Sequence, residues 1–231
     1  MRKYALAAAT LLALAAPAFA VVLDADDVGL TGTTTLQGQV GGAPVAGLSG
    51  TLGLTFVSIT GGGTIWNFGY AVDNTTSGGL TSELSGFGLN TTPNLSGATA
   101  TGLYSASVTT NAQLSSGTTI DFCASAGPTC SGGASNGIDP DDPIATGTFS
   151  LIFASAQTSI SLDAAFGRFQ GITGNGFSGD SGIGTNPDVC VGCVPFQVPG
   201  PALGAGIPGM IAGALGLWAL VRRRQRHELV G

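Results

Sequence analysis

The stretch LGLTFVSITGGGTIWNFGYAV, residues 52–72, decides the fold of this chain. Large apolar side chains fall on every second residue before and after the glycine triplet at 61–63, at Leu52, Leu54, Phe56, Trp66, Phe68, Tyr70 and Val72. This period-two alternation indicates strands with one buried face, and glycines between two such runs predict a hairpin. We expect Trp66 to lie in the core, with a sugar-binding platform as its alternative role.

Similar but shorter runs occupy the rest of residues 21–170, at 82–89, 102–108, 118–123, 148–154 and 159–169. The lead-in over 21–50 is expected to add one or two short strands. No convincing helical period interrupts this pattern, and the many Gly and Thr residues disfavour helix. We therefore predict an all-β, antiparallel, β-sandwich-like domain over 21–170, with an irregular barrel as the alternative. Residues 171–197 are Gly-rich and are predicted to be a loop or stalk.

The N-terminal residues 1–20 have the pattern of a secretory signal peptide. Arg2 and Lys3 precede a largely apolar run over 5–16, and Ala18 and Ala20 form a small-residue cleavage site. The mature chain is then expected to begin at Val21. A retained N-terminal anchor is the alternative, although the apolar run is short for a membrane span.

The C-terminal residues 198–226 combine three parts in a fixed order. The motif Val198, Pro199, Gly200, Pro201 and Ala202 comes first, and an uncharged run over 203–221 follows it. At about 1.5 Å per residue this run gives about 28 Å of helix, close to the thickness of a bilayer core. The basic stop over 222–226 contains Arg222, Arg223, Arg224 and Arg226. Arginines beside a span stay on the cytoplasmic side, so we predict one C-terminal transmembrane helix with the body of the protein outside.

This tail resembles the sorting signal of the PEP-CTERM proteins, which are exported by Gram-negative bacteria. Gly200 stands where the family has its name-giving Glu, so the motif is a variant. The region WNFGYAVDNTTSGGLTSELSGFGLN (66–90) is also similar to a recurrent part of PEP-CTERM ectodomains, and together with the cysteines and GRFQ (167–170) to the subset called the cistern family. The resemblance implies transient anchoring in the inner membrane, cleavage by an exosortase-type membrane protease, and release to the cell surface or extracellular matrix. Exopolysaccharide is then a candidate partner.

The charge of the predicted exported part is strongly one-sided. Between residues 21 and 197 the chain carries one basic residue, Arg168, against twelve acidic residues, a net charge of −11. Such a surface repels nucleic acid, so we expect no nucleic-acid partner. We expect Arg168 to pair with a carboxylate at the rim of the sheet.

The four cysteines, Cys123, Cys130, Cys190 and Cys193, are even in number in a chain that we expect to be exported. Disulfides are therefore predicted. The pairs Cys123–Cys130 and Cys190–Cys193 are favoured because each is close in sequence. The alternatives are a zinc site that uses all four thiolates and a redox CxxC at 190–193.

The absence of certain residue types restricts the chemistry of the exported part. The single histidine, His227, follows the predicted span, and residues 21–197 contain no lysine. A Ser-His-Asp or Cys-His site and a Schiff-base lysine cannot be built there. We therefore predict no catalytic residues, cofactor or metal, and a non-enzymatic surface or extracellular-matrix protein.

Two alternatives to this function remain. One is a carbohydrate- or calcium-binding adhesion module, in which Asp139, Asp141 and Asp142 would offer oxygens to calcium. Their spacing does not fit an EF-hand loop and also suits a solvated acidic turn. The other is a glycoside hydrolase that works with paired carboxylates.

Overall fold

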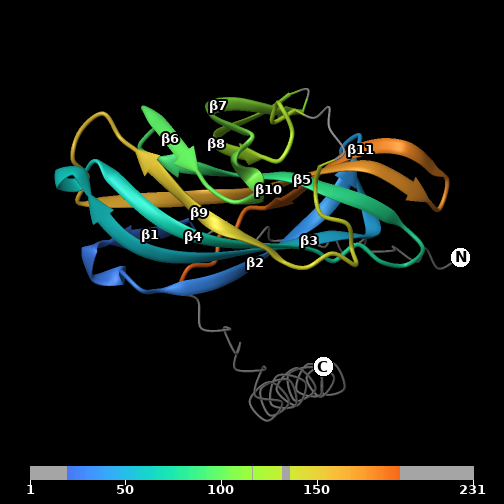
Figure 1. The fold of residues 1–231 in the computed structure, drawn as a ribbon, viewed down its shortest axis with the longest axis horizontal. Coiled ribbons are helices and arrows are strands. Elements are labelled where there is room, and N and C mark those ends of the chain that lie inside the picture. The colour runs from blue at the N-terminus through green and yellow to red at the C-terminus, as the bar shows by residue number, and fades with distance from the viewer. Residues whose placement is uncertain (1–19, 116, 132–135, 193–231) are drawn as a thin grey trace, which may run out of the picture. The chain divides into compact units, whose positions relative to one another are not determined.

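The computed structural model describes residues 20–192, apart from 116 and 132–135, and these residues form one antiparallel sheet with three short 3₁₀ helices (Figure 1). The all-β, antiparallel prediction is confirmed. The strands are β1 (Val21–Asp24), β2 (Thr31–Val40), β3 (Ala43–Thr60), β4 (Ile65–Asn74), β5 (Thr81–Thr92), β6 (Gly97–Ala100), β7 (Ser107–Ser115), β8 (Thr118–Ser125), β9 (Ala145–Ile152), β10 (Ser159–Gly174) and β11 (Phe177–Asn186). The 3₁₀ helices are η1 (Ala25–Asp27), η2 (Gly61–Gly63) and η3 (Leu103–Ser105).

The strand order is β6-β9-β4-β3-β2-β11-β10-β5-β8-β7, with β1 paired along β10. The two ends of this path, β6 and β7, contact each other, so the sheet curls into a nearly closed, barrel-like form around its core. One curled sheet therefore replaces the predicted two-sheet sandwich. The curled sheet corresponds to the predicted alternative of an irregular barrel, because its strands belong to a single hydrogen-bonded path.

The predicted hairpin around the glycine triplet is confirmed. β3 and β4 pair antiparallel, with Phe56 opposite Phe68 and, after a register shift between Phe56 and Ser58, Ile59 opposite Trp66. The turn needs a left-handed backbone, which Gly62 supplies with φ of 66°. Every second side chain of β4 is buried in the core, because successive side chains of a strand point to opposite faces of the sheet.

The interior contains a connected group of eight aromatic side chains among many aliphatic ones, and we call this group the aromatic core: Phe56, Trp66, Phe68, Tyr70, Phe87, Tyr104, Phe122 and Phe149. Neighbouring rings stack, with centroids 5.2 Å apart for Phe56 and Trp66 and 4.7 Å apart for Phe122 and Phe149. Trp66 is fully buried, and its indole Nε1 donates to the carbonyl oxygen of Gly63 at 3.2 Å. Trp66 is therefore a core residue and not a sugar platform.

A second, smaller group of buried residues lies apart from the aromatic core. This hairpin cluster consists of Ala112, Leu114, Ile120, Cys123 and Cys130, from β7, β8 and the segment after β8. Phe166 of β10 and Ile183 of β11 are partly buried and pack against it. The β7–β8 hairpin is therefore packed against side chains of β10 and β11 as well as paired with β5.

The prediction of a loop or stalk over 171–197 is wrong for Phe177–Asn186, which forms β11 between β10 and β2. The glycines of β11 allow this strand to lie between β10 and β2. A Cβ on Gly184 would lie 2.8 Å from the Phe169 ring and 2.9 Å from the Leu36 side chain, so the strand needs a residue without a side chain there. The strand predicted over 102–108 is also wrong in its first half, because Leu103–Ser105 forms η3 and β7 begins only at Ser107.

The predicted targeting segments are largely outside the described residues. Residues 1–19 of the predicted signal peptide (1–20) and the whole predicted sorting signal over 198–226 are not part of them. Val21, the predicted first residue of the mature chain, begins β1 and pairs with Leu162 of β10. In the part of the chain that the structure describes, no helix has the length and apolarity required to cross a membrane.

Candidate functional site

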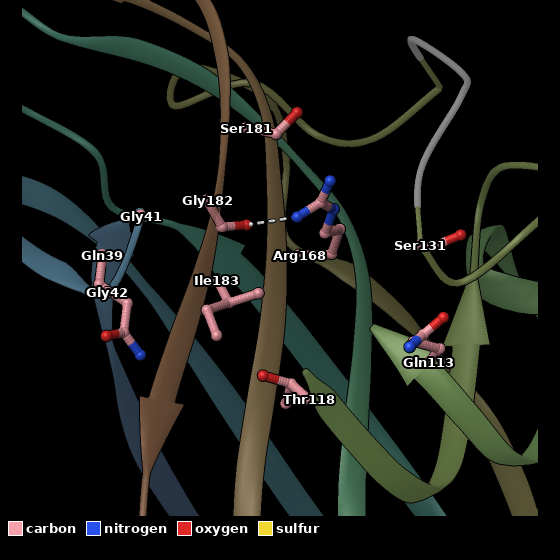
Figure 2. Close-up of a pocket in the computed structure, with 10 residues that line it drawn as sticks. All are labelled: Gln39, Gly41, Gly42, Gln113, Thr118, Ser131, Arg168, Ser181, Gly182 and Ile183. Carbon is pink, nitrogen blue, oxygen red and sulfur yellow. Dashed lines mark hydrogen bonds between the residues drawn. The ribbon is translucent and has the colours of Figure 1, made fainter. Parts of the chain in front are cut away.

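The candidate site is a groove of about 790 Å³ on the surface of the sheet, which we call the Arg168 groove. Figure 2 shows Arg168 between two walls. One wall comes from β2, the β2–β3 turn and β11, and the other from β7, β8 and the segment after β8. The lining residues are Gln39, Gly41, Gly42, Gln113, Thr118, Ser131, Arg168, Ser181, Gly182 and Ile183.

Strand alternation explains why Arg168 faces this groove. Its neighbours in β10, Gly167 and Phe169, are buried, and Phe169 belongs to the interior core. The side chain between them points to the opposite face of the strand. Arg168 lies opposite Ile183 of β11 and Gly86 of β5, so no carboxylate occupies either cross-strand position.

The guanidinium of Arg168 is half-buried and poorly compensated. Its Nη1 donates to the carbonyl oxygen of Gly182 at 3.3 Å, and its Nε is buried without a hydrogen-bond partner. Burial also lowers the pKa of Arg168 from its usual value. Among the described residues no carboxylate forms a salt bridge with this side chain, so the predicted ion pair at the sheet rim is wrong. The groove therefore contains a cation whose neighbouring protein groups carry no full negative charge.

The rim around this cation is uncharged and rich in hydrogen-bonding groups. Gln39, Gln113 and Ser131 contribute amide and hydroxyl groups from the two walls, and Thr118 and Ser181 add further hydroxyls (Figure 2). None of the lining residues that the structure describes is acidic. Such a site can accept an anionic group at Arg168 while the rim exchanges hydrogen bonds with neutral polar groups.

The disulfide between Cys123 and Cys130 is formed, as predicted, with the Cα atoms 6.2 Å apart. It ties the segment that leads to Ser131 back to β8, and so it supports one wall of the groove. Cys190 is disulfide-bonded as well, and Cys193 of the predicted second pair lies outside the described residues. The Cys123–Cys130 bond removes two thiolates from the alternative four-cysteine zinc site, which is therefore excluded.

The acidic segment 139–142 is a capped turn. The backbone N–H of Asp139 donates to Oδ2 of Asp142 at 2.9 Å, and Ile138 forms an isolated bridge with Leu84. This arrangement brings Asp139 and Asp142 near Glu83. Burial, together with these two carboxylates, raises the pKa of Glu83. Within residues 20–192, gaps aside, no three His, Cys, Asp or Glu side chains are grouped so that they could hold a metal.

The sequence directs attention to only part of this site. Arg168 stands out as the one basic residue between residues 21 and 197, whereas Gln39, Gln113 and Ser181 carry no signal, because polar residues of strands are ordinary surface residues. The residues of the predicted sorting signal, Val198–Ala202 and Arg222–Arg226, lie outside the described residues. Comparison of the chain with protein-family models, with curated proteins and with solved structures gives no match.

Proposed function

We propose that the protein is an exported, non-enzymatic surface or extracellular-matrix protein. The signal peptide directs it through the general secretory route, and the apolar run over 203–221 holds it in the inner membrane with its body in the periplasm. An exosortase-type protease then cuts near Pro199–Ala202 and releases the body. This processing follows from the likeness of residues 198–226 to the PEP-CTERM sorting signal.

The observation that carries the proposal is the Cys123–Cys130 disulfide. Structural disulfides persist in oxidising compartments such as the periplasm and the cell exterior. The start of β1 at Val21 supports the same route, since cleavage after Ala20 leaves every described strand intact. A short edge strand that begins at the new terminus is a suitable product of signal-peptide removal.

The proposal is tested by following the mass of the pulse-labelled full chain in cells that contain the sorting protease. We expect two successive losses, first of residues 1–20 and then of the tail after the 198–202 motif. Cells without the protease, and a Pro199→Ala/Pro201→Ala variant, are the controls and should stop after the first loss. One unchanging mass after signal removal contradicts the cutting step. A soluble full-length chain in the cytosol contradicts export.

The second candidate function is a carbohydrate-binding adhesion module, and the Arg168 groove favours it. Uncharged amides and hydroxyls around a recess are the groups that recognise sugar hydroxyls. The calcium version is less favoured, because Oδ2 of Asp142 already caps its own turn. The remaining alternative, a carboxylate-based glycoside hydrolase, is tested by comparing the protein with its Asp→Asn and Glu83→Gln variants on a panel of glycosides.

A further inference from the structure

We propose that the Arg168 groove binds the carboxylate of a uronic-acid residue that stands among neutral sugars in a polysaccharide. This inference rests on the carbohydrate-binding function proposed above and names its ligand. In the proposed complex the carboxylate lies against the guanidinium of Arg168, and the ring hydroxyls of the sugar exchange hydrogen bonds with the rim of the groove.

The first argument is the missing counter-charge of Arg168. A half-buried guanidinium normally has a carboxylate partner, because a desolvated charge is costly without one. Here the protein offers a single backbone carbonyl at 3.3 Å and leaves Nε buried without a partner. Because Nε has almost no exposed surface, an incoming carboxylate would supply the anion at the Nη groups of the planar guanidinium, in charge-assisted hydrogen bonds.

The second argument is the chemistry of the rim. Gln39 and Gln113 present both amide donors and carbonyl acceptors from opposite walls, and Ser131 and Ser181 present hydroxyls (Figure 2). Sugar hydroxyls are likewise both donors and acceptors, so each rim group can pair with one. The groove volume of about 790 Å³ lies within the range of pockets that bind small ligands. A carboxylate with adjacent hydroxyls on one ring matches this combination.

The third argument selects the charge of the ligand. The exported part carries a net charge of −11, so densely charged polymers such as nucleic acids or polyphosphates are repelled. Beyond a Debye length of about 8 Å this repulsion is screened at physiological salt. Among the described residues no acid lines the groove, and one cation balances one negative charge. A singly charged sugar among neutral neighbours therefore fits better than a phosphate ester with two charges.

The experiment is a calorimetric titration of the purified full chain with three probes. These are a uronate-containing oligosaccharide, a neutral oligosaccharide of the same length, and acetate as the carboxylate alone. We expect the uronate probe to bind, and the other two to bind at least about tenfold more weakly, since a hydrogen bond to a charged group contributes about 1.5–3 kcal/mol. Acetate tests whether the carboxylate is recognised without the sugar.

The variants separate the role of Arg168 from general effects of charge. Arg168→Gln should weaken uronate binding at least about tenfold, and Arg168→Lys should retain part of it, because the charge remains but the planar fork is lost. Thr158→Asp changes the net charge by the same single unit, roughly 30 Å away along the strand direction, and should bind like wild type. Thermal melting checks that each variant is folded. If Arg168→Gln does not fold, a Gln113→Ala/Ser181→Ala variant on exposed rim positions tests the same site.

Several outcomes would overturn the inference. The first is wild-type affinity for the uronate probe in folded Arg168→Gln, or in the rim variant if Arg168→Gln does not fold. The second is that wild type binds the neutral probe as tightly as the uronate probe. The third is that wild type binds acetate as tightly as the uronate probe. Binding of peptide carboxylates in place of uronate would also overturn it. Its failure is distinct from failure of the proposed function. Equal binding of the neutral oligosaccharide contradicts only the uronate ligand, whereas binding of neither oligosaccharide contradicts the carbohydrate-binding function on which the inference rests.

Discussion

The aromatic core and the hairpin cluster are stabilised in different ways. The aromatic core consists of large stacked rings from long strands, such as Phe56 on Trp66 and Phe68 on Phe149. The hairpin cluster has only small and aliphatic side chains beside the Cys123–Cys130 bond. Burial of apolar surface stabilises the first region, and a covalent link supplements a small amount of burial in the second.

The difference matters because one wall of the candidate site is built on the second region. One wall of the Arg168 groove belongs to β2 and β11 of the main sheet. The other wall, with Gln113, Thr118 and Ser131, belongs to the hairpin that the disulfide supports. The site therefore depends on the region with the smaller core, while the aromatic core serves as its scaffold.

The largest expected effect on stability follows from Trp66→Ala. This side chain is fully buried and stacked, so its removal leaves a cavity and should lower the free energy of unfolding by about 3–5 kcal/mol. Chemical denaturation measures this loss. Val57→Ala on the neighbouring strand, where the side chain is 49% exposed, is the control and should cost under about 0.5 kcal/mol. A loss below about 1 kcal/mol for Trp66→Ala would contradict the role assigned to the aromatic core.

Removal of the disulfide should have a smaller and more local effect. Cys123→Ala/Cys130→Ala opens a loop with a sequence separation of 7, for which the chain-entropy estimate is about 2–3 kcal/mol. Hydrogen exchange should quicken in β7 and β8 and stay slow in β3 and β4. This variant leaves the disulfide of Cys190 in place, which chemical reduction would not. Equal acceleration in all four strands would show that the two regions are not separable.

The smallest effect is expected at Glu83, which lies outside both clusters. Burial and the neighbouring Asp139 and Asp142 raise its pKa, so the folded state retains a proton that the unfolded state releases. The free energy of unfolding should therefore fall as pH rises from the ordinary carboxyl pKa of about 4.3 through the raised value.

Glu83→Gln should remove this fall, with a difference under about 1 kcal/mol because the residue as a whole is only partly buried. Denaturation at several pH values measures it. Asp141→Asn, an exposed acid of the same turn, is the control and should keep the wild-type slope. The same pH slope in Glu83→Gln as in wild type would contradict the assignment.

The interior of the fold was predictable from the sequence because large apolar side chains alternate along β4 and reappear in β5, β8, β9 and β10. The strand β11 was not predictable, because Gly182 and Gly184 resemble loop residues until their contacts with neighbouring strands are known. The curl of the sheet was not predictable either, since the pairing of β11 with β2 joins strands separated by most of the chain. For the site, the isolated positive charge drew attention to Arg168. The expected carboxylate partner was wrong, because the alternation of residues in the sequence does not reveal which residues lie opposite Arg168 on neighbouring strands.

The dependence of the site on the hairpin is tested most directly by titrating the uronate oligosaccharide into Cys123→Ala/Cys130→Ala. With Trp218 replaced by Phe in all samples, Trp66 is the only tryptophan, and its fluorescence in the same sample reports whether the aromatic core is still packed. We predict that binding weakens at least about tenfold while Trp66 remains buried, because the wall with Gln113 and Ser131 loses its support. Wild-type affinity in this variant would contradict a site built on the disulfide-supported hairpin.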